Sequence, residues 1–456
     1  MNSFGGDLRA ASIAVVLFSL MSAALAQTMP NQITGSSQQS AGTAPITLTL
    51  QDALERARKN NPEYQTAVTE YGLAKEDKVQ SRAALLPNVN FNSSFVYTEG
   101  GGSPGVGRYV ANNGVHEYIS QGDVHQEFSL AHIAEYRRTL AAQALARARA
   151  EIATRGLVLT VVQTYYGFVV AQRKYATAQR AEAEAQHFFD LSQKLERGGE
   201  VAHADVIKAE IQFQEQERAL KEAELEMQRN RLELAVLIFP DFNQNFAVVD
   251  DLQIPEPLPT FAEAQTAAAN NNPDLRAALA AVREANQEIA AAWSGFLPSV
   301  TIDYFYGIDA THFAVNGIDP TTRMPIHNLG YAGTATLQLP IWNWGSNRSK
   351  LKQASLRRQQ AHVELSFAQR RLLANLQNFY GEAQTSRVQL DSLEHSAELA
   401  AESLRLTTMR YQAGESTALE VVDAQNTLVQ ARNALHEGQS RYRVSLANLQ
   451  TLTGTL

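Results

Sequence analysis

The main candidates for functional side chains lie in one stretch, Leu404–Leu428, with the sequence LRLTTMRYQAGESTALEVVDAQNTL. Glu420 and Asp423 lie three positions apart, so on a helix their carboxylates share one face. Carboxylates on one face create a negative field that attracts cations and repels anions. The alternative is a solvated acidic patch near a helix N-terminus, stabilised by the helix dipole alone. Either way, the stretch indicates an electrostatic role rather than bond-making.

Motifs for catalysis or metal binding are weak in the rest of the chain. Gly101-x-Ser103-x-Gly105 matches the nucleophile-elbow pattern, but it lies in a loop between strands with no helix after it. His312 and His327 share a loop without a third metal ligand. Because no arrangement of acid, base, nucleophile and metal ligands emerges, we predict that the chain is not an enzyme and binds no cofactor or metal.

Composition excludes further classes. The chain has 456 residues, of which 45% are hydrophobic and 19% charged, and no segment has the pattern of a bundle of membrane helices. Its formal net charge of -8 and the lack of a basic cluster exclude a nucleic-acid partner. The chain contains no cysteine, which excludes disulfides and thiol chemistry.

The N-terminus has the form of an export signal. In residues 1–26, Arg9 precedes an apolar run, and the Ala-Leu-Ala that ends at Ala26 matches a signal-peptidase site. The mature chain would begin near Gln27, and an uncleaved anchor is the alternative. Residues 27–45 are rich in Ser, Gln, Thr and Gly, which predicts a flexible leader.

The remaining chain repeats one design twice, in residues 46–240 and 260–456, joined by a linker at 241–259. Each copy opens with a capping-box pattern, at Thr49 and Thr260. Each then reaches an Asn-Asn-Pro and continues as helix to a Leu-Pro stop. All of these motifs recur at one constant offset, which indicates an internal repeat.

After each Leu-Pro the apolar pattern changes from helical to alternating, which predicts β-strands at 87–97, 124–130, 298–308 and 329–340. Strands of about ten residues with an aromatic-rich apolar face are typical of outer-membrane barrels, and equally of a soluble sandwich. Four strands cannot close a membrane barrel, and an open edge cannot lie in lipid. Several chains must therefore share one barrel, or the strands are not in a membrane.

Helices account for most of the expected fold. Two uninterrupted runs, Ala131–Leu195 and Ser346–Gln412, would each span roughly 100 Å at about 1.5 Å per residue. Helices this long must pack sideways, which favours a helical barrel or bundle over a simple two-stranded coil. Shorter helical arms are expected at 49–86, 201–239, 261–296 and 417–453. The predicted fold class is mainly α with a β part.

Each long run turns back at glycine, at Gly198 and Gly199 in the first copy and at Gly414 in the second. Glycine supplies the left-handed or tight-turn conformations that such tips require. Arg197 and Arg410 precede these turns, where a cation also suits a helix C-terminus.

These features together resemble the outer membrane efflux protein family over about Ile46–Thr453. The resemblance is carried by Leu-Thr-Leu-x-x-Ala-Leu and Asn-Pro within Leu48–Pro62, and by Leu-Pro before the first and third strands. It continues at the tip, with Arg-Tyr-x-x-Gly from Arg410 and Glu-Val-Val-Asp-Ala from Glu420. The resemblance implies a homotrimer, with four strands per chain in a shared twelve-stranded outer-membrane β-barrel above a twelve-helix periplasmic α-helical barrel.

The resemblance also implies a function: the outer-membrane exit duct of a tripartite efflux or type I secretion system. The partners would be outer-membrane lipid, a periplasmic adaptor (membrane fusion protein) and an inner-membrane transporter of RND, ABC or MFS type. The loops Thr98–Glu117 and Asp309–Asn328 would face outward. The residues alone leave open a periplasmic coiled-coil scaffold or adaptor without a membrane barrel. The cargo, whether drugs, metals, metabolites or protein, does not follow from the sequence.

The family's entrance gate corresponds to Tyr411, Glu420 and Asp423, and Asp205 takes the position of Glu420 in the first hairpin. In a trimer, these carboxylates would form rings at a narrow mouth. The chain departs from the family pattern at Ser416, where an arginine helps to lock the closed mouth. The tip residues implied to contact the adaptor are Arg197, Gly198, Gly199, Arg410 and Gly414.

Overall fold

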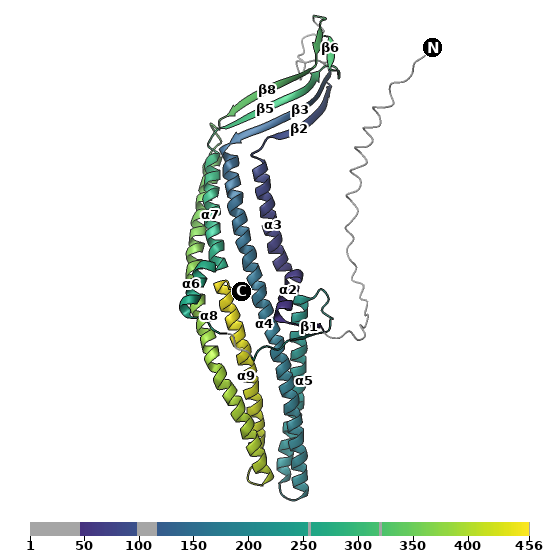
Figure 1. The fold of residues 1–456 in the computed structure, drawn as a ribbon, viewed down its shortest axis with the longest axis vertical. Coiled ribbons are helices and arrows are strands. Elements are labelled where there is room, and N and C mark those ends of the chain that lie inside the picture. Colours follow the sequence, from purple (N-terminus) through teal and green to yellow (C-terminus); the bar gives the residue numbers. More distant parts are fainter. Residues whose placement is uncertain (1–45, 98–115, 254–256, 319–321, 456) are drawn as a thin grey trace, which may run out of the picture. The chain divides into compact units, whose positions relative to one another are not determined.

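The computed structural model describes residues 46–97, 116–253, 257–318 and 322–455. The expected signal peptide at 1–26 and leader at 27–45 lie outside the described residues. Within 46–455, long helices run side by side and carry a four-stranded sheet at one end (Figure 1). No described helix has both the length and the apolar character needed to cross a membrane. The mainly helical fold class with a β part is confirmed.

Two uninterrupted helices dominate the fold: α4, Leu130–Arg197, and α8, Ser346–Gln412. Each turns back onto a shorter helix, α4 onto α5 (His203–Ile238) and α8 onto α9 (Ala418–Thr453). The two hairpins also contact each other, because α4 packs against α9. Gly438 allows the second hairpin to pack closely, since a Cβ there would lie 2.5 Å from Leu393 Cδ1.

The shorter arm before each sheet is broken at Asn-Pro, where the sequence predicted continuous helix. Asn61 and Asn272 are extended (φ −77° and −63°), and each caps the following helix by accepting a hydrogen bond from a backbone N–H. A proline that follows disfavours helical backbone at the asparagine and supplies no N–H. The arms are therefore four helices: α2 (Leu50–Asn60), α3 (Pro62–Ala83), α6 (Phe261–Asn271) and α7 (Pro273–Ser294).

The sheet is antiparallel, in the order β2-β3-β5-β8. All four predicted strands are present, but β3 begins eight residues before the predicted Val124. The strands are β2 (Asn88–Tyr97), β3 (His116–Ser129), β5 (Ser299–Ala310) and β8 (Leu329–Gln338). Among the strands of the described residues, β2 and β8 each have one neighbour, so the described sheet has two open edges.

The register gives the sheet one apolar and one polar face, as the alternation predicted. One row across the four strands consists of Val89, Val124, Tyr304 and Gly333. The adjacent row, on the opposite face, consists of Asn88, His125, Asp303 and Thr334. In this polar row, His125 Nδ1 lies 2.6 Å from Asp303 Oδ1.

Two small pairings complete the fold. β1 (Ile46–Leu48) runs parallel to β4 (Phe246–Val248), and the Tyr165 hydroxyl of α4 donates to the carbonyls of Leu48 and Val249. Burial raises the pKa of Tyr165 to about 12, so this anchor stays protonated at physiological pH. The other pairing, β6 (Asn316–Ile318) with β7 (Pro325–His327), forms a hairpin inside the predicted second outer loop.

Candidate functional site at the tips of the helical hairpins

Both hairpin turns are built on a left-handed glycine, at Gly199 (φ 77°) and Gly414 (φ 74°). The N–H after each glycine donates to a carbonyl five residues back, at 2.9 Å in the first turn and 2.8 Å in the second. This pattern is the Schellman motif, which satisfies the last carbonyls of a helix. Gly198 instead has right-handed backbone (φ −78°) and caps α4, so only one glycine of the first tip needs the left-handed region.

Tyr411 lies in a buried seam between the two hairpins. Its side chain is 2% exposed, and its ring centroid is 5.1 Å from that of Phe188 on α4. Its hydroxyl is 3.2 Å from the Ser192 hydroxyl, also on α4. Burial raises the pKa of Tyr411, and the negative charge of Asp205 adds to this, so the phenol is neutral at physiological pH. Tyr411 thus ties the end of α8 to the first hairpin.

Glu420 acts as the capping residue of α9. Its carboxylate accepts a hydrogen bond from the backbone N–H of Thr417 (3.3 Å), and its own backbone N–H donates to the Thr417 hydroxyl oxygen (3.4 Å), which together form a capping box. The Thr417 hydroxyl also lies 3.2 Å from the carboxylate. Ser416, where the family resemblance expects arginine, donates to the same carboxylate at 3.2 Å. Arg410 Nη1 lies 3.8 Å from it. The Thr417 backbone N–H, then the two hydroxyls, hold the pKa of Glu420 below its usual range.

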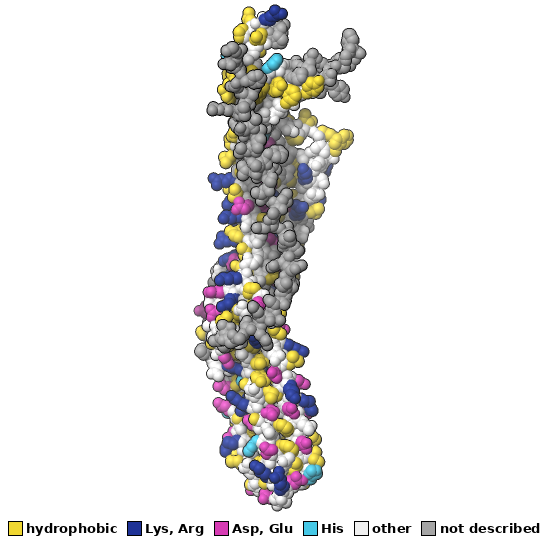
Figure 2. Space-filling model, turned by 90° about the vertical axis from the view of Figure 1, so that its right-hand side faces the viewer, with side chains coloured by type: hydrophobic (Ala, Val, Ile, Leu, Met, Phe, Trp, Pro, Cys, Tyr) yellow, Lys and Arg dark blue, Asp and Glu magenta, His cyan; other side chains and the backbone are white. Residues whose placement is uncertain are grey.

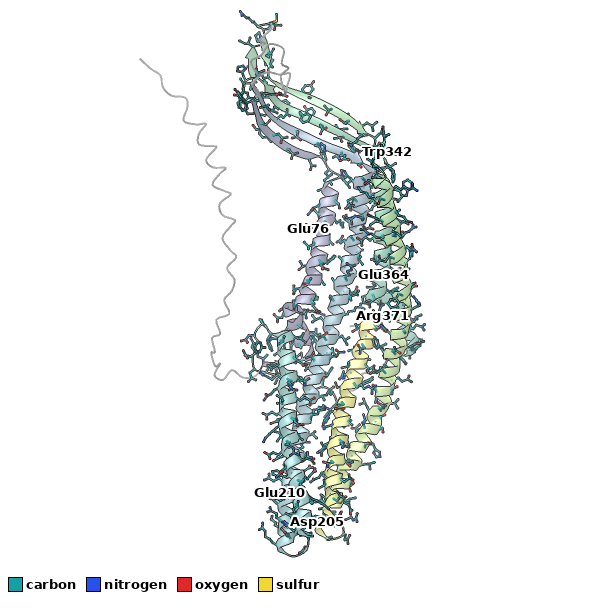
Figure 3. All side chains as sticks on the ribbon, turned by 180° about the vertical axis from the view of Figure 1, so that it is seen from behind. Glu76, Asp205, Glu210, Trp342, Glu364 and Arg371 are labelled. Atoms are coloured by element: carbon teal, nitrogen blue, oxygen red, sulfur yellow. The ribbon has the colours of Figure 1, made fainter. Side chains whose placement is uncertain are left out.

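The other two carboxylates of the predicted gate lie apart from this box. Asp423 is exposed on α9, three residues beyond Glu420. Asp205 is half-buried in the first turn of α5, at the tip end of the molecule (Figure 3), and it is close enough to influence Tyr411. The structure therefore places Asp205 near enough for its charge to act on the Tyr411 phenol and leaves Asp423 available to solvent.

Sequence patterns did not identify the polar partners that join the hairpins. Ser192 is fully buried against Tyr411. Farther from the tip, Asn426 Oδ1 on α9 accepts from the amides of Gln212 (2.9 Å) and Gln216 (3.3 Å) on α5. These residues look like ordinary helix-surface positions in the sequence, and only the packing of the two hairpins reveals their pairing.

The residues predicted to touch an adaptor stand at the surface. Arg197 and Arg410 are exposed beside their turns, where Arg410 also donates to the Glu415 carbonyl at 3.1 Å. Exposed apolar side chains, among them Met409 and Leu419, lie beside them. The tip end in Figure 2 carries basic, acidic and hydrophobic side chains in alternation. Such a mixed surface is typical of a contact site that is not permanently buried.

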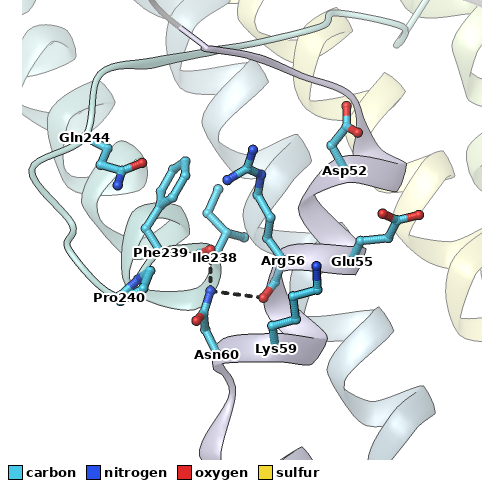
Figure 4. Close-up of a pocket in the computed structure, with 9 residues that line it drawn as sticks. All are labelled: Asp52, Glu55, Arg56, Lys59, Asn60, Ile238, Phe239, Pro240 and Gln244. Atoms are coloured by element: carbon cyan, nitrogen blue, oxygen red, sulfur yellow. Dashed lines mark hydrogen bonds between the residues drawn. The ribbon is translucent and has the colours of Figure 1, made fainter.

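A hollow of about 360 Å³ lies where α2 meets the end of α5 (Figure 4). It is lined by Asp52 and Arg56 from α2 and by Phe239 and Gln244 from the segment after α5, among other residues. The Asn60 amide donates to the carbonyls of Ile238 and Arg56, and so joins the two helices across this hollow. The contacts across this hollow hold α2 and α5 together, and both acidic and basic side chains line it.

The structure adds no observation in favour of the weak catalytic and metal-binding motifs. Gly101, Ser103 and Gly105 lie outside the described residues. The His327 ring pairs with the Asn316 side chain at 2.6 Å. Among residues 46–97, 116–253, 257–318 and 322–455, no three potential metal ligands gather in one place.

The architecture described above consists of paired helical hairpins that carry a two-faced sheet at one end. A family model described as outer membrane efflux protein matches residues 53–238 and 265–455, which fall within the two repeats. The chain therefore belongs to the outer membrane efflux protein family, and the resemblance inferred from the repeat and tip motifs is confirmed.

Named relatives cover most of the chain. The alkaline protease secretion protein AprF of Pseudomonas aeruginosa is 22% identical over 428 residues, which are 90% of this chain and 85% of the relative. The outer membrane protein TolC of Escherichia coli is 23% identical over 419 residues, which are 89% and 82% of the two chains.

Solved structures share the fold. The outer membrane channel CmeC of Campylobacter jejuni superposes with a TM-score of 0.74 at 18% identity, over 94% of this chain and 92% of that one. The open state of the MtrE outer membrane channel of Neisseria gonorrhoeae has a TM-score of 0.71 at 22% identity, over 89% and 88%.

Removing either hydroxyl of the Tyr411–Ser192 pair should loosen the tip. We expect Tyr411→Phe and Ser192→Ala each to lower the free energy of local opening at the end of α8 by about 1 kcal/mol. Amide exchange there should therefore become roughly fivefold faster. The double variant should cost less than the sum, because the pair is one interaction. Hydrogen exchange with mass spectrometry measures this. Thr408→Val is the matched control, because it removes a hydroxyl that bonds only within α8. If the effects of the two single variants were strictly additive in the double variant, the pairing of Tyr411 with Ser192 would be contradicted.

The start of α9 should respond to acid. Since the pKa of Glu420 is lowered in the folded chain, its capping contribution is complete above the usual glutamate pKa of 4.5 and is lost as the pH falls through the lowered value. Amide protection at the start of α9, corrected for intrinsic exchange rates, should therefore drop below pH 4.5 in the native chain. Glu420→Gln should remove this dependence, and Asp423→Asn should leave it. Equal acid responses in the native chain and Glu420→Gln would contradict the capping role.

Proposed function

We propose that the chain works as a homotrimeric exit duct in the outer membrane, through which an inner-membrane transporter and a periplasmic adaptor export their substrate. The observation that carries this proposal is the sheet: four strands, two open edges, and faces of opposite character. Three copies joined edge to edge would make twelve strands, with the apolar faces in lipid and the polar faces around a water-filled passage. Membership of the family supports this duct over a periplasmic scaffold.

Aromatic residues at the sheet–helix junction support a membrane position for the sheet. Trp342 and Trp344 are 76% and 90% exposed and lie in the segment between β8 and α8. Figure 3 shows Trp342 where the helices meet the sheet, far from Asp205 at the tip. Tryptophan is enriched where a membrane meets water. This junction is where the inner surface of the outer membrane would lie.

The charges along the proposed passage favour cations. The strands β2, β3, β5 and β8 contain no lysine or arginine. Their polar face carries acidic side chains, including Asp303 and Asp123. At the other end, Asp423 and Asp205 would be repeated three times around a mouth formed by the hairpin tips. A negative potential over both ends attracts cations and repels anions.

The proposed contacts with partner proteins are placed at the tips of the helical hairpins. Arg197, Arg410 and the turns at Gly198, Gly199 and Gly414 form the exposed end of each hairpin, where an adaptor would dock. The energy for transport would come from an RND, ABC or MFS transporter. Tyr411, Glu420, Asp423 and Asp205 would form the gate at the mouth, with Tyr411 holding the hairpins together.

Reconstitution in a planar bilayer tests the proposal. Detergent-extracted trimer should conduct with a preference for cations, and the double variant Asp205→Asn/Asp423→Asn should shift the reversal potential towards zero without loss of trimer, because the mouth loses carboxylates. Glu76→Gln, an exposed carboxylate on α3 far from the tip, is the control and should leave selectivity unchanged. A soluble monomer without conductance would overturn the duct. An unchanged reversal potential in the double variant would overturn the gate assignment.

A further inference from the structure

The β6–β7 hairpin exposes an unusual amount of apolar surface. Ile318 is 71% exposed, Met324 67% and Phe313, just before β6, 64%. Val315 and Ile326 are also exposed. The hairpin lies beyond the outer ends of β5 and β8 (Figure 1), and hydrophobic side chains beside basic ones gather at this end in Figure 2.

The pairing of the hairpin puts apolar side chains on both of its faces. Ile318 and Pro325 pair on one face, which also carries the polar Asn316–His327 pair, and the Gly317–Ile326 pair is on the other face. Strands of three residues in an isolated two-stranded pairing are marginal in water, and a hairpin in water normally keeps one face polar. The exposed side chains of Ile318, Met324 and Ile326 on so small a pairing therefore favour an apolar surrounding over water.

Continuity with the sheet indicates what that surrounding is. Phe95 and Tyr118 pair across β2 and β3, with ring centroids 4.7 Å apart, and Phe95 has the same strand parity as Val89 on the apolar face. The Tyr118 ring is 6.3 Å from the ring of Phe313. An aromatic path thus runs without a break from the lipid-facing side of the sheet to the base of the hairpin.

We propose that the β6–β7 hairpin is a lipid-contacting element, which extends the apolar face of the sheet into the outer leaflet of the membrane. This inference rests on the proposed function, because it takes the apolar face of the sheet to lie in lipid. The exposed Arg323, adjacent to Met324, suits the level of the lipid phosphates, since a long cationic side chain can reach the headgroups while its apolar stem stays with the neighbouring side chains. The hairpin would thus attach the outer end of each chain to the lipid of the outer leaflet.

Single-cysteine labelling tests this directly, because the native chain has no cysteine. Trimers of Ile318→Cys and Met324→Cys would carry a nitroxide label and be reconstituted in vesicles of phosphatidylethanolamine, phosphatidylglycerol and lipopolysaccharide. Power saturation then compares the access of lipid-soluble oxygen with that of a water-soluble nickel chelate. Tyr331→Cys, on the apolar face and 78% exposed, is the lipid control, and Leu419→Cys, at the tip and 60% exposed, is the water control.

We expect the labels at 318 and 324 to favour oxygen severalfold over nickel, as the label at 331 does and the label at 419 does not. Access by nickel at 318 and 324 but not at 331 would overturn the inference and leave the duct intact. Access by nickel at 331 as well would overturn the proposed function itself. Strong spin–spin broadening at 318 and 324 would mean that hairpins of neighbouring copies meet each other, which also overturns the lipid contact.

Discussion

The two open edges of the described sheet limit how this chain can lie in a membrane. In lipid, every backbone N–H and C=O needs a partner, and among the described residues β2 and β8 each lack a partner strand on their outer side. In the proposed trimer, edge pairing between copies would remove this cost, and the helices below would then stand side by side as well. The long hairpins, the sheet and the acidic tips would thus be parts of one assembly that a single chain cannot complete.

Some of the helices also leave apolar surface uncovered in the single chain. α3 buries none of its residues within the chain, and α8 is far less buried along its length than α4. Large apolar side chains on α8, such as Val363, Phe367 and Val388, are exposed in the single chain. By contrast, α4 is central, because it packs against α3, α5, α7 and α9. α4 therefore organises each protomer, while α3 and α8 present surfaces suited to neighbouring copies.

Local patterns in the sequence predict much of this fold. The capping boxes at Thr49 and Thr260, the glycine turns and the alternating strands all depend on residues close together in the chain. The break at Asn-Pro was missed, because the helical pattern continues on both sides and hides one extended residue. The gate assignment stays a prediction. The capping contacts of Glu420 with Thr417 were not predicted, although they join residues close together in the chain, and the contact of Tyr411 with Ser192 joins residues far apart in sequence. The β6–β7 hairpin carries too few residues for a strand pattern.

Disulfide trapping between the edge strands tests the shared sheet most directly. In an up-and-down barrel, β2 of one copy is antiparallel to β8 of the next. Cysteines placed at Val89 and Leu337, both at the ends of the strands nearest the helices, should therefore come together. Neighbouring positions on the same face would be tested as well, to find the register. We predict oxidised bands of two and three linked chains and nothing larger, whereas Val89 with Tyr331, at the far end of β8, should not link. Absence of any β2–β8 linkage, or ladders beyond three chains, would contradict a barrel shared by three copies.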